Sequence, residues 1–120
     1  MIEKYLCGMT FAPFVGSGRL NTQQARESLK TMKERLCANF VILAPNGVQE
    51  TPQSETICYT SKATMTDDEL KATIAYAQEL GFMVALKPTA NCSNGTWRAH
   101  INFFDEDVQC EPKWSNWFAS

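Results

Sequence analysis

The stretch Thr66–Pro88, TDDELKATIAYAQELGFMVALKP, combines a helix with a strand that follows it directly. Thr66 and Glu69 have the form of a capping box, which predicts that a helix begins directly after Thr66. Apolar residues then recur at spacings of three and four, as on the buried side of an amphipathic helix: Leu70, Ile74, Ala77 and Leu80. Gly81 stands where helices usually end, and the apolar run Phe82–Leu86 after it predicts a strand.

The same order of elements occurs once before this stretch. After Asn21 or Thr22, either of which can cap a helix, apolar side chains repeat at helical spacing: Ala25, Leu29, Met32 and Leu36. Phe40–Ala44 is a short, uninterrupted apolar run, typical of a parallel strand that is buried on both faces. An earlier strand is predicted over Tyr5–Phe11, and the Pro and Gly residues of Ala12–Gly18 break it.

Strand and helix therefore alternate, as in a (β/α) barrel or a doubly wound sheet. The predicted strands start at about Tyr5, Phe40 and Phe82, and these intervals of 35 and 42 residues suit the units of a barrel of about 250 residues. No G-x-G-x-x-G pattern follows the first strand, which disfavours a dinucleotide-binding sheet. The predicted fold class is α/β. Residues 1–120 would form a single N-terminal part of a (β/α)8 TIM barrel, with three parallel strands, two full crossover helices and the start of a third helix at Pro112–Phe118.

The composition excludes several classes of function. With 120 residues, 44% of them hydrophobic and 20% charged, the chain suits one globular domain. A net charge of -2 without a basic stripe argues against nucleic acid as a partner. No run approaches the ~20 apolar residues that span a bilayer. We therefore expect a soluble protein that binds neither nucleic acid nor membrane.

The five cysteines are an odd number without a C-x-x-C pair, which favours free thiols in a reducing cytoplasm. The start of the chain lacks the basic and apolar segments of a secretion signal, so a cytoplasmic location is expected. A bridge between Cys92 and Cys110 stays open as an alternative, because sequence alone does not show whether their Cα atoms come close enough.

Two long polar segments follow the second and third predicted strands, over Gln49–Thr64 and from Thr89 to about Glu111. In a barrel, the loops at the carboxyl ends of the strands build the active site. These ends and loops supply amides, a guanidinium, an ammonium and an indole: Asn46, Gln49, Asn91, Asn94, Asn102, Arg98, Lys87 and Trp97. Such groups bind the hydroxyls of a sugar and stack on its C–H face, so we expect a carbohydrate ligand.

Several of these residues also have a purely structural interpretation. Trp97 either stacks on sugar or pins its loop to the rim of the barrel, and Arg98 either faces the ligand or pairs with the acidic run Asp105–Asp107. That run otherwise suits a solvated surface. His100, the single histidine, suits packing in the loop better than catalysis and excludes a metal site of several histidines. Lys87 stands at a strand end, where a charge is costly unless it faces the mouth of the barrel.

Glycoside hydrolysis usually needs two carboxyl groups across the scissile bond, about 5 to 9.5 Å apart. No Asp or Glu directly follows a predicted strand: Glu50 and Glu55 lie well into their loop, and Asp67 and Asp68 stand at a helix start. Glu111 lies beyond the third loop. The sequence therefore predicts a scaffold and part of a cleft, without a catalytic residue, a cofactor or a metal ion of its own.

Certain segments occur in a recognisable order along the chain: Gly8–Phe11, Ala25–Leu29, Asn39–Leu43, Leu86-Lys87-Pro88, Asn91-Cys92 and Gly95–Ile101. Together they resemble the N-terminal part of glycoside hydrolase family 113, whose members are (β/α)-barrel β-1,4-mannanases. The resemblance covers essentially the whole chain and is most specific at Leu86-Lys87-Pro88 and Gly95–Ile101. It implies a retaining mechanism with an acid/base glutamate after the fourth strand and a nucleophile glutamate after the seventh, and neither strand is predicted in this chain.

The resemblance also implies roles in the substrate cleft for six residues: Lys87, Asn91, Trp97, Arg98, His100 and Phe11. The expected function is that of the N-terminal portion of a retaining glycoside hydrolase acting on β-1,4-linked polysaccharide, above all mannan, and inactive as an isolated chain. The alternative is a non-catalytic carbohydrate-binding or self-assembling half-barrel. The expected partners are an oligo- or polysaccharide and either further copies of the chain or a complementing part of a barrel.

Overall fold

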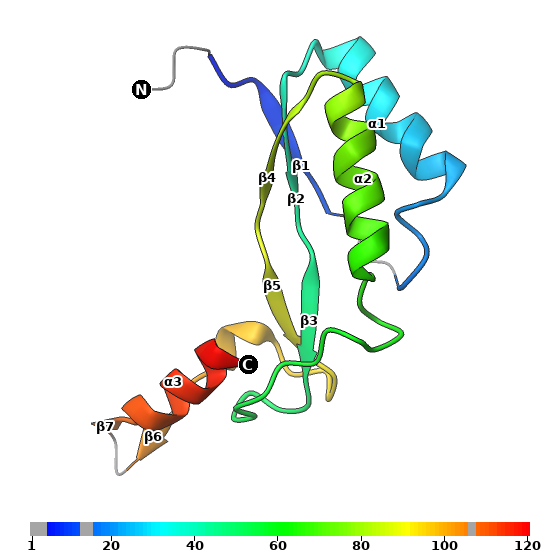
Figure 1. The fold of residues 1–120 in the computed structure, drawn as a ribbon. Helices are drawn as coiled ribbons and strands as arrows, with labels where there is room; N and C mark the ends of the chain where they lie inside the picture. Colours follow the sequence, from blue (N-terminus) through cyan, green and yellow to red (C-terminus); the bar gives the residue numbers. More distant parts are fainter. Residues whose placement is uncertain (1–4, 13–15, 106–107) are drawn as a thin grey trace.

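The computed structural model describes residues 5–12, 16–105 and 108–120, and a parallel sheet of three strands lies at its centre (Figure 1). β1 (Gly8–Phe11) and β4 (Met83–Leu86) lie on either side of β2 (Phe40–Leu43). The three strands and their parallel pairing are as predicted. The middle of the predicted loop over residues 12–18 lies outside the described ranges.

β1 is shorter than the strand predicted from Tyr5 to Phe11. The side chain of Asn39 accounts for the difference, because its Oδ1 accepts from the Cys7 N–H at 2.8 Å and its Nδ2 donates to the Tyr5 carbonyl at 2.8 Å. The Cys7 carbonyl still accepts from the backbone N–H of Asn39 at 2.8 Å, but the Asn39 side chain takes the place of backbone at the other two groups, and the strand register begins at Gly8.

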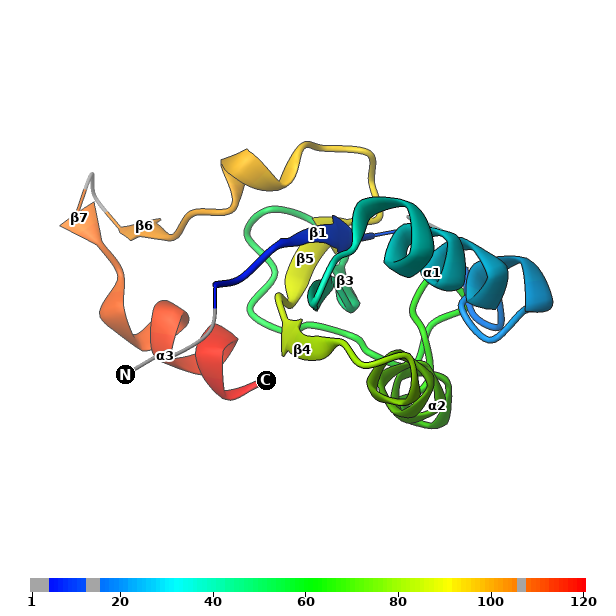
Figure 2. The ribbon, with the colours of Figure 1, turned by 90° about the horizontal axis from the view of Figure 1, so that it is seen from above.

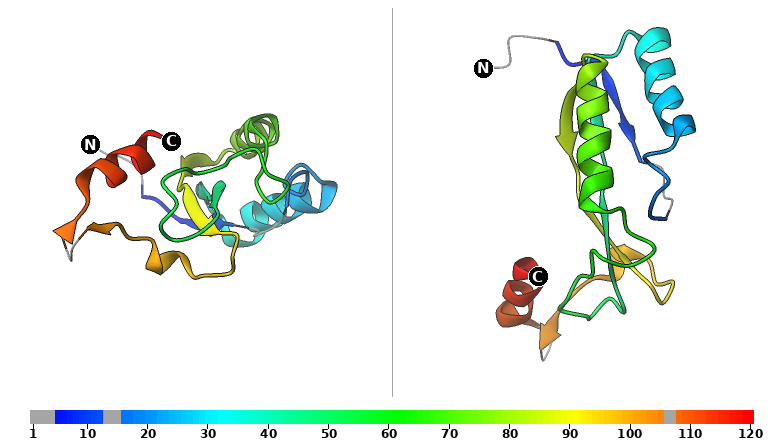
Figure 3. Two further views of the ribbon diagram at one scale, coloured as in Figure 1. Left: turned by 90° about the horizontal axis from the view of Figure 1, so that it is seen from below. Right: turned by 45° about the vertical axis from the view of Figure 1, so that its right-hand side comes forward.

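α1 (Gln23–Leu36) and α2 (Asp67–Glu79) connect the strands and cover the same face of the sheet (Figure 2, Figure 3). The hydroxyl of Thr22 accepts from the Ala25 N–H at 3.2 Å, so Thr22 rather than Asn21 caps α1. Each helix therefore serves as the crossover between two parallel strands, as predicted.

α2 begins and ends where the sequence predicts. The Thr66 hydroxyl accepts from the Glu69 N–H at 3.1 Å, and Gly81 adopts a φ of 82°, which glycine tolerates without steric cost. Of the predicted capping box, only the bond from the Glu69 N–H to the Thr66 hydroxyl is formed. Both carboxylate oxygens of Glu69 instead accept from backbone N–H groups of the loop after β1.

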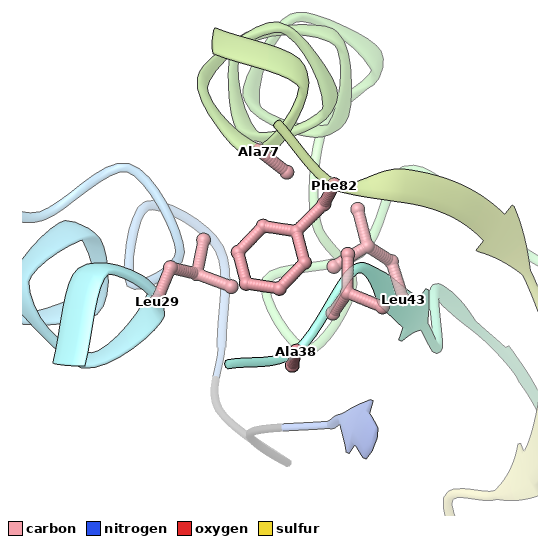
Figure 4. Close-up of a cluster of buried hydrophobic side chains, with 6 residues drawn as sticks. Leu29, Ala38, Leu43, Ala77 and Phe82 are labelled. Carbon is pink, nitrogen blue, oxygen red and sulfur yellow. The ribbon is translucent and has the colours of Figure 1, made fainter. Parts of the chain in front are cut away.

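The core lies between the two helices and the sheet, and six buried residues form it: Leu29, Ala38, Val41, Leu43, Ala77 and Phe82. Figure 4 shows the ring of Phe82 between Leu29 of α1 and Leu43 of β2. Val41 and Leu43 are buried, whereas Phe40 and Ile42 on the other face of β2 are only partly covered. The expectation that β2 is buried on both faces is therefore wrong for this chain, because helices cover one face alone.

Two further strands continue β2 and β4 past Pro45 and Pro88, beyond the predicted strand ends at Ala44 and Leu86. β3 (Asn46–Gln49) and β5 (Thr89–Cys92) are parallel partners. β5 lies within the loop predicted from Thr89, and β3 reaches the predicted loop Gln49–Thr64 at its last residue. Four backbone N–H groups donate to carbonyls at 2.8 to 2.9 Å, and donor and acceptor are the same number of positions apart in every pair: Met83 to Asn39, Lys87 to Leu43, Thr89 to Pro45 and Ser93 to Gln49. The register therefore continues through Pro45 and Pro88, and each proline only removes a single N–H donor.

The remainder of the chain lies at the carboxyl end of the strands, away from α1 and α2 (Figure 1, Figure 3). It contains the short 3-10 helix η1 (Arg98–His100), an antiparallel pair of β6 (Phe104–Asp105) with β7 (Val108–Gln109), and α3 (Glu111–Ala119). The helix predicted at Pro112–Phe118 is thus present. The strand pair and η1 lie inside the segment predicted as an irregular loop.

All five cysteines are unpaired, so the alternative bridge between Cys92 and Cys110 is not formed. Within the described residues, no helix has the length and apolar character required to cross a membrane.

Candidate functional site

A cavity of about 460 Å³ lies at the carboxyl end of the parallel strands. Residues of β3, β5 and the loops line it: Gly16, Asn46, Val48, Ala63, Asn91, Cys92 and Ser93. The Asn46 side chain donates to the Ala63 carbonyl at 3.0 Å, which leaves its Oδ1 as an acceptor. Amides and a hydroxyl therefore dominate the polar lining, as a site for neutral hydroxylated ligands requires.

The regular ladder places several predicted residues on one face. Side chains alternate along a strand, so Lys87, Thr89 and Asn91 share a face of the strand formed by β4 and β5. Asn91 is opposite Val48, and both line the cavity. Lys87 is exposed just before β5. In the described part of the chain, the Thr89 hydroxyl oxygen is the only buried side-chain polar atom without a hydrogen-bond partner.

Arg98 reaches back from η1 to this face. Its Nη1 donates to the Asn91 Oδ1 at 3.3 Å. Among the described residues the single ion pair joins Lys30 to Glu34, so Arg98 does not pair with Asp105. Asp107, the other acid considered as its partner, lies outside the described residues. The structure thus brings Asn91 and Arg98 together as one hydrogen-bonded unit.

Trp97 and His100 form a second pair beside this unit. Their rings meet edge to face with centroids 6.2 Å apart, and Trp97 is 69% exposed. The turn before them is stabilised by Gly95, whose φ is 82°, and by the Asn94 Oδ1, which accepts from the Thr96 N–H at 3.0 Å. An indole with this exposure is available for stacking and contributes little to the core.

Phe11, the sixth predicted residue, lies apart from the other five. It packs against the core and lines a groove between β1 and α1, together with Met32 and Leu36. That groove has a volume of about 610 Å³ and follows the free edge of β1. The structure therefore does not bring Phe11 to the Asn91 cavity, and its role in binding stays a prediction.

Gln49 has a role that sequence reasoning did not assign. It is 1% exposed, its Oε1 accepts from the Trp117 indole N–H at 2.8 Å, and its Nε2 donates to the Thr51 carbonyl at 2.7 Å. Nearby, the Asn116 side chain donates to the Glu55 carboxylate at 2.8 Å. The bonds from Trp117 and Asn116 fasten α3 to the last residue of β3 and to the loop after it. No local pattern could have revealed them, because the partners are 61 and 68 positions apart.

The acidic residues considered above lie in separate places within the described part of the chain. Glu55 is engaged by Asn116, Asp67 and Asp68 belong to the first turn of α2, and Glu111 accepts from the Ser115 hydroxyl at 2.8 Å within α3. Glu50 is exposed directly after β3 and is the one acid of this set without such a role. Within the described residues, no group of three His, Cys, Asp or Glu side chains could hold a metal ion. The site can therefore bind a polar ligand, but these acids do not supply both an acid and a nucleophile.

The comparisons with known proteins agree on one family. The sequence model of Glycoside Hydrolase Family 113 matches residues 9–120. The chain belongs to glycoside hydrolase family 113. It folds as part of a (β/α)8 barrel, because its parallel sheet with crossover helices superposes on solved structures of that family.

Three solved structures show how far the likeness extends. A β-1,4-mannanase of this family is 45% identical, with a TM-score of 0.84 over 97% of this chain and 38% of its own. A complex of such a mannanase is 44% identical, with a TM-score of 0.79 over 89% of this chain and 36% of its own. AaManA from Alicyclobacillus acidocaldarius, solved with ManMIm, is 38% identical, with a TM-score of 0.78 over 93% of this chain and 36% of its own.

The chain spans little more than a third of the length of these family 113 mannanases. A search of curated proteins gives no match. The family resemblance stated from the sequence is therefore confirmed, while the roles of its six residues are not tested by these likenesses.

Proposed function

We propose that this chain supplies the N-terminal part of the substrate cleft of a retaining β-1,4-mannan hydrolase. The observation that carries the proposal is the hydrogen-bonded pair of Asn91 and Arg98 beside an exposed Trp97, at the carboxyl end of the sheet in a family 113 chain. The pair offers donors and acceptors to sugar hydroxyls, and the indole offers an apolar face.

The isolated chain is expected to bind without cleaving. Retaining hydrolysis requires two carboxyl groups about 5 to 5.5 Å apart. Of the acids considered above, Glu55 and Glu111 accept side-chain hydrogen bonds and Asp67 and Asp68 stand at a helix start, which leaves only the exposed Glu50. The acid/base and nucleophile glutamates would come from the remaining strands of the barrel. A non-catalytic binding module is the alternative, and it has the same cleft without any hydrolytic partner.

Titration with mannotetraose, followed by Trp fluorescence and by a reducing-end assay, tests the proposal. Binding without new reducing ends is expected for the wild type, with weaker binding by Trp97→Ala and Asn91→Ala. Phe104→Ala is a matched control, since Phe104 is also an exposed aromatic but belongs to the β6–β7 pair. Turnover above a blank that a substitution in this chain abolishes would contradict the proposal, and so would a wild type that does not bind.

We further propose that the partner of this chain is the rest of a barrel. The sheet has three strands with free edges at β1 and β4, and three of the eight strands of a barrel is about 37%. The chain covers 36% to 38% of the mannanase chains, which agrees with this fraction. Copies of a three-strand unit cannot close an eight-stranded barrel, so a complement of five strands is favoured over self-assembly.

The unpaired thiols support one more proposal, that the protein works in the cytoplasm. Reducing compartments keep such thiols free. Fractionation of cells that express the protein, with thiol labelling of each fraction, tests it; recovery from an oxidising compartment with disulfides formed would contradict it.

A further inference from the structure

Glu69 has a buried carboxylate that the proposed cleft has not yet explained. It is 5% exposed, and among the described residues it is the only charged side chain that is buried. Its Oε2 accepts from the Gly18 N–H at 2.8 Å, and its Oε1 accepts from the Leu20 N–H at 2.7 Å. These are short, charge-assisted bonds, and they join the first turn of α2 to the loop after β1.

Burying a carboxylate is costly unless it is hydrogen bonded, so an acid at this place needs a reason. A capping role would be served locally, by a bond from Glu69 back to the N–H of Thr66. Both oxygens are instead directed to a segment some fifty positions earlier in the chain. The carboxylate therefore holds the loop after β1, and the Thr66 hydroxyl alone caps the helix.

That loop forms part of the cavity wall. Gly16 lines the cavity with Asn46 and Asn91, and Ser17, next to it, donates its N–H to the Lys62 carbonyl at 3.1 Å. A Cβ at Gly16 would come within 2.9 Å of the same carbonyl, so the two loops approach each other closely. The wall is thus fixed at two points, by the Lys62 carbonyl on one side and by Glu69 on the other.

We propose that Glu69 is a positioning residue of the cleft, because it fixes the loop around Gly16 and thereby the width of the Asn46–Asn91 cavity. It touches no ligand itself. Its effect on sugar binding rests on the proposed function, whereas its effect on the shape of the cavity does not.

Glu69→Gln is the sharpest test, because it keeps the volume and replaces one acceptor oxygen by an amide that would face an N–H donor. We expect the backbone amide signals of Gly16 and Ser17 and the side-chain amide signal of Asn91 to shift in 1H–15N spectra. Mannotetraose should bind at least five-fold more weakly. Glu79→Gln removes a charge from the exposed end of the same helix and should change neither readout.

The outcomes separate the possible explanations. A Glu69→Gln protein with a lowered melting temperature but unchanged Gly16 and Asn91 signals would overturn the inference, since Glu69 would then stabilise the fold only. If the wild type does not bind mannotetraose, the proposed function fails, and the amide signals still decide the role of Glu69. Glu69→Asp retains both oxygens on a shorter arm and serves if Glu69→Gln does not fold; smaller shifts of the same signals are expected, and their absence counts against the inference.

Discussion

Trp97 illustrates at the scale of single residues how exposure separates two interpretations that the sequence left open. A residue that pins a loop must be covered by it, whereas Trp97 is 69% exposed and its ring meets that of His100 edge to face. This exposure argues against the loop-pinning interpretation, whereas the sequence Gly95-Thr96-Trp97 is compatible with both. The ligand-facing role stays a proposal.

Trp97→Ala should accordingly change the free energy of unfolding by no more than about 0.5 kcal/mol, as for other surface substitutions. Phe103→Ala is the control in the same loop. Phe103 is 2% exposed and packs edge to face on Trp114 with centroids 4.8 Å apart, so its truncation should cost about 3 to 5 kcal/mol. Denaturant titration measures both. A loss of more than about 2 kcal/mol for Trp97→Ala would restore the loop-pinning interpretation.

Two cysteines should differ in reactivity. The backbone and the hydroxyl of Thr60 form hydrogen bonds that lower the pKa of the exposed Cys58 thiol, whereas burial raises the pKa of Cys92 at the cavity. At neutral pH a larger fraction of Cys58 is thiolate, and the thiolate is the reactive form. Iodoacetamide should therefore alkylate Cys58 several-fold faster than Cys92, as followed by peptide mass spectrometry.

The difference in alkylation rate between Cys58 and Cys92 should depend on pH. The ratio of the two rates should shrink as the pH rises above both pKa values, because both thiols are then ionised. Thr60→Val removes the hydroxyl and should slow alkylation of Cys58 near pH 7. Equal rates for Cys58 and Cys92 at that pH would show that Thr60 does not govern the reactivity.

At the scale of elements, Lys33 connects the ends of the two helices. Its Nζ donates to the Ala38 carbonyl after α1 at 2.9 Å and to the Gly81 carbonyl after α2 at 3.2 Å, and it lies 5.0 Å from the centroid of the Phe82 ring. A cation near these carbonyls also favours the negative ends of both helix dipoles. The two crossover helices thus share one side chain at the edge of the core.

Lys33→Met keeps the aliphatic stem and removes the charge, so it should lower the free energy of unfolding by about 1 to 3 kcal/mol. Lys30→Met is the matched control on the same helix. Lys30 forms an exposed pair with Glu34 at 3.8 Å, and such pairs contribute about 0 to 1 kcal/mol. Similar losses for both variants, measured by urea unfolding, would mean that Lys33 does not hold the helix ends.

The docking of α3 depends on Gln49. Gln49→Leu would leave the Trp117 N–H and the Thr51 carbonyl without their partner, which should cost about 1 to 3 kcal/mol and speed hydrogen exchange in α3. Gln53→Leu, at an exposed position of the loop after β3, should stay within about 0.5 kcal/mol of the wild type. Unchanged exchange in α3 would show that the helix is held by its aromatic contacts alone.

The elements also show what sequence can predict and why the rest escapes it. Helices α1 and α2 follow from caps and periodic apolar residues, which are local features. β3 and β5 were not predicted, because a proline usually ends a strand and Pro45 and Pro88 precede them. Here the register continues past both prolines, and it depends on pairing between segments that are distant in the chain. The same holds for the site. The sequence predicted that Asn91 and Arg98 belong to one cleft, but it did not predict the roles of Glu69 and Gln49, whose partners are distant in the chain.

At the scale of the whole molecule, the sheet is open on both sides, and apolar side chains are exposed along its edges. Met9 on β1 is 53% exposed and Leu86 on β4 is 48% exposed. Closed barrels have no such edges, and unpaired edges of a sheet bind further strands. Among the described residues, no strand pairs with the outer edge of β1 or of β4, and the groove between β1 and α1 lies beside the first of these edges.

We expect the isolated chain to associate in a concentration-dependent way at tens of micromolar, because copies can pair edges without ever closing an eight-stranded barrel. Light scattering should report a mixture of sizes rather than one dimer. Addition of the remaining portion of the 45% identical mannanase, which lacks the part matched here, should replace this mixture by a discrete one-to-one complex. Met9→Lys and Leu86→Lys should each reduce self-association, because a charge on a strand edge opposes pairing. A chain that stays monomeric and does not bind the remaining barrel portion would contradict the prediction. It would mean that the loops or the Trp117–Phe118 segment of α3 cover the edges.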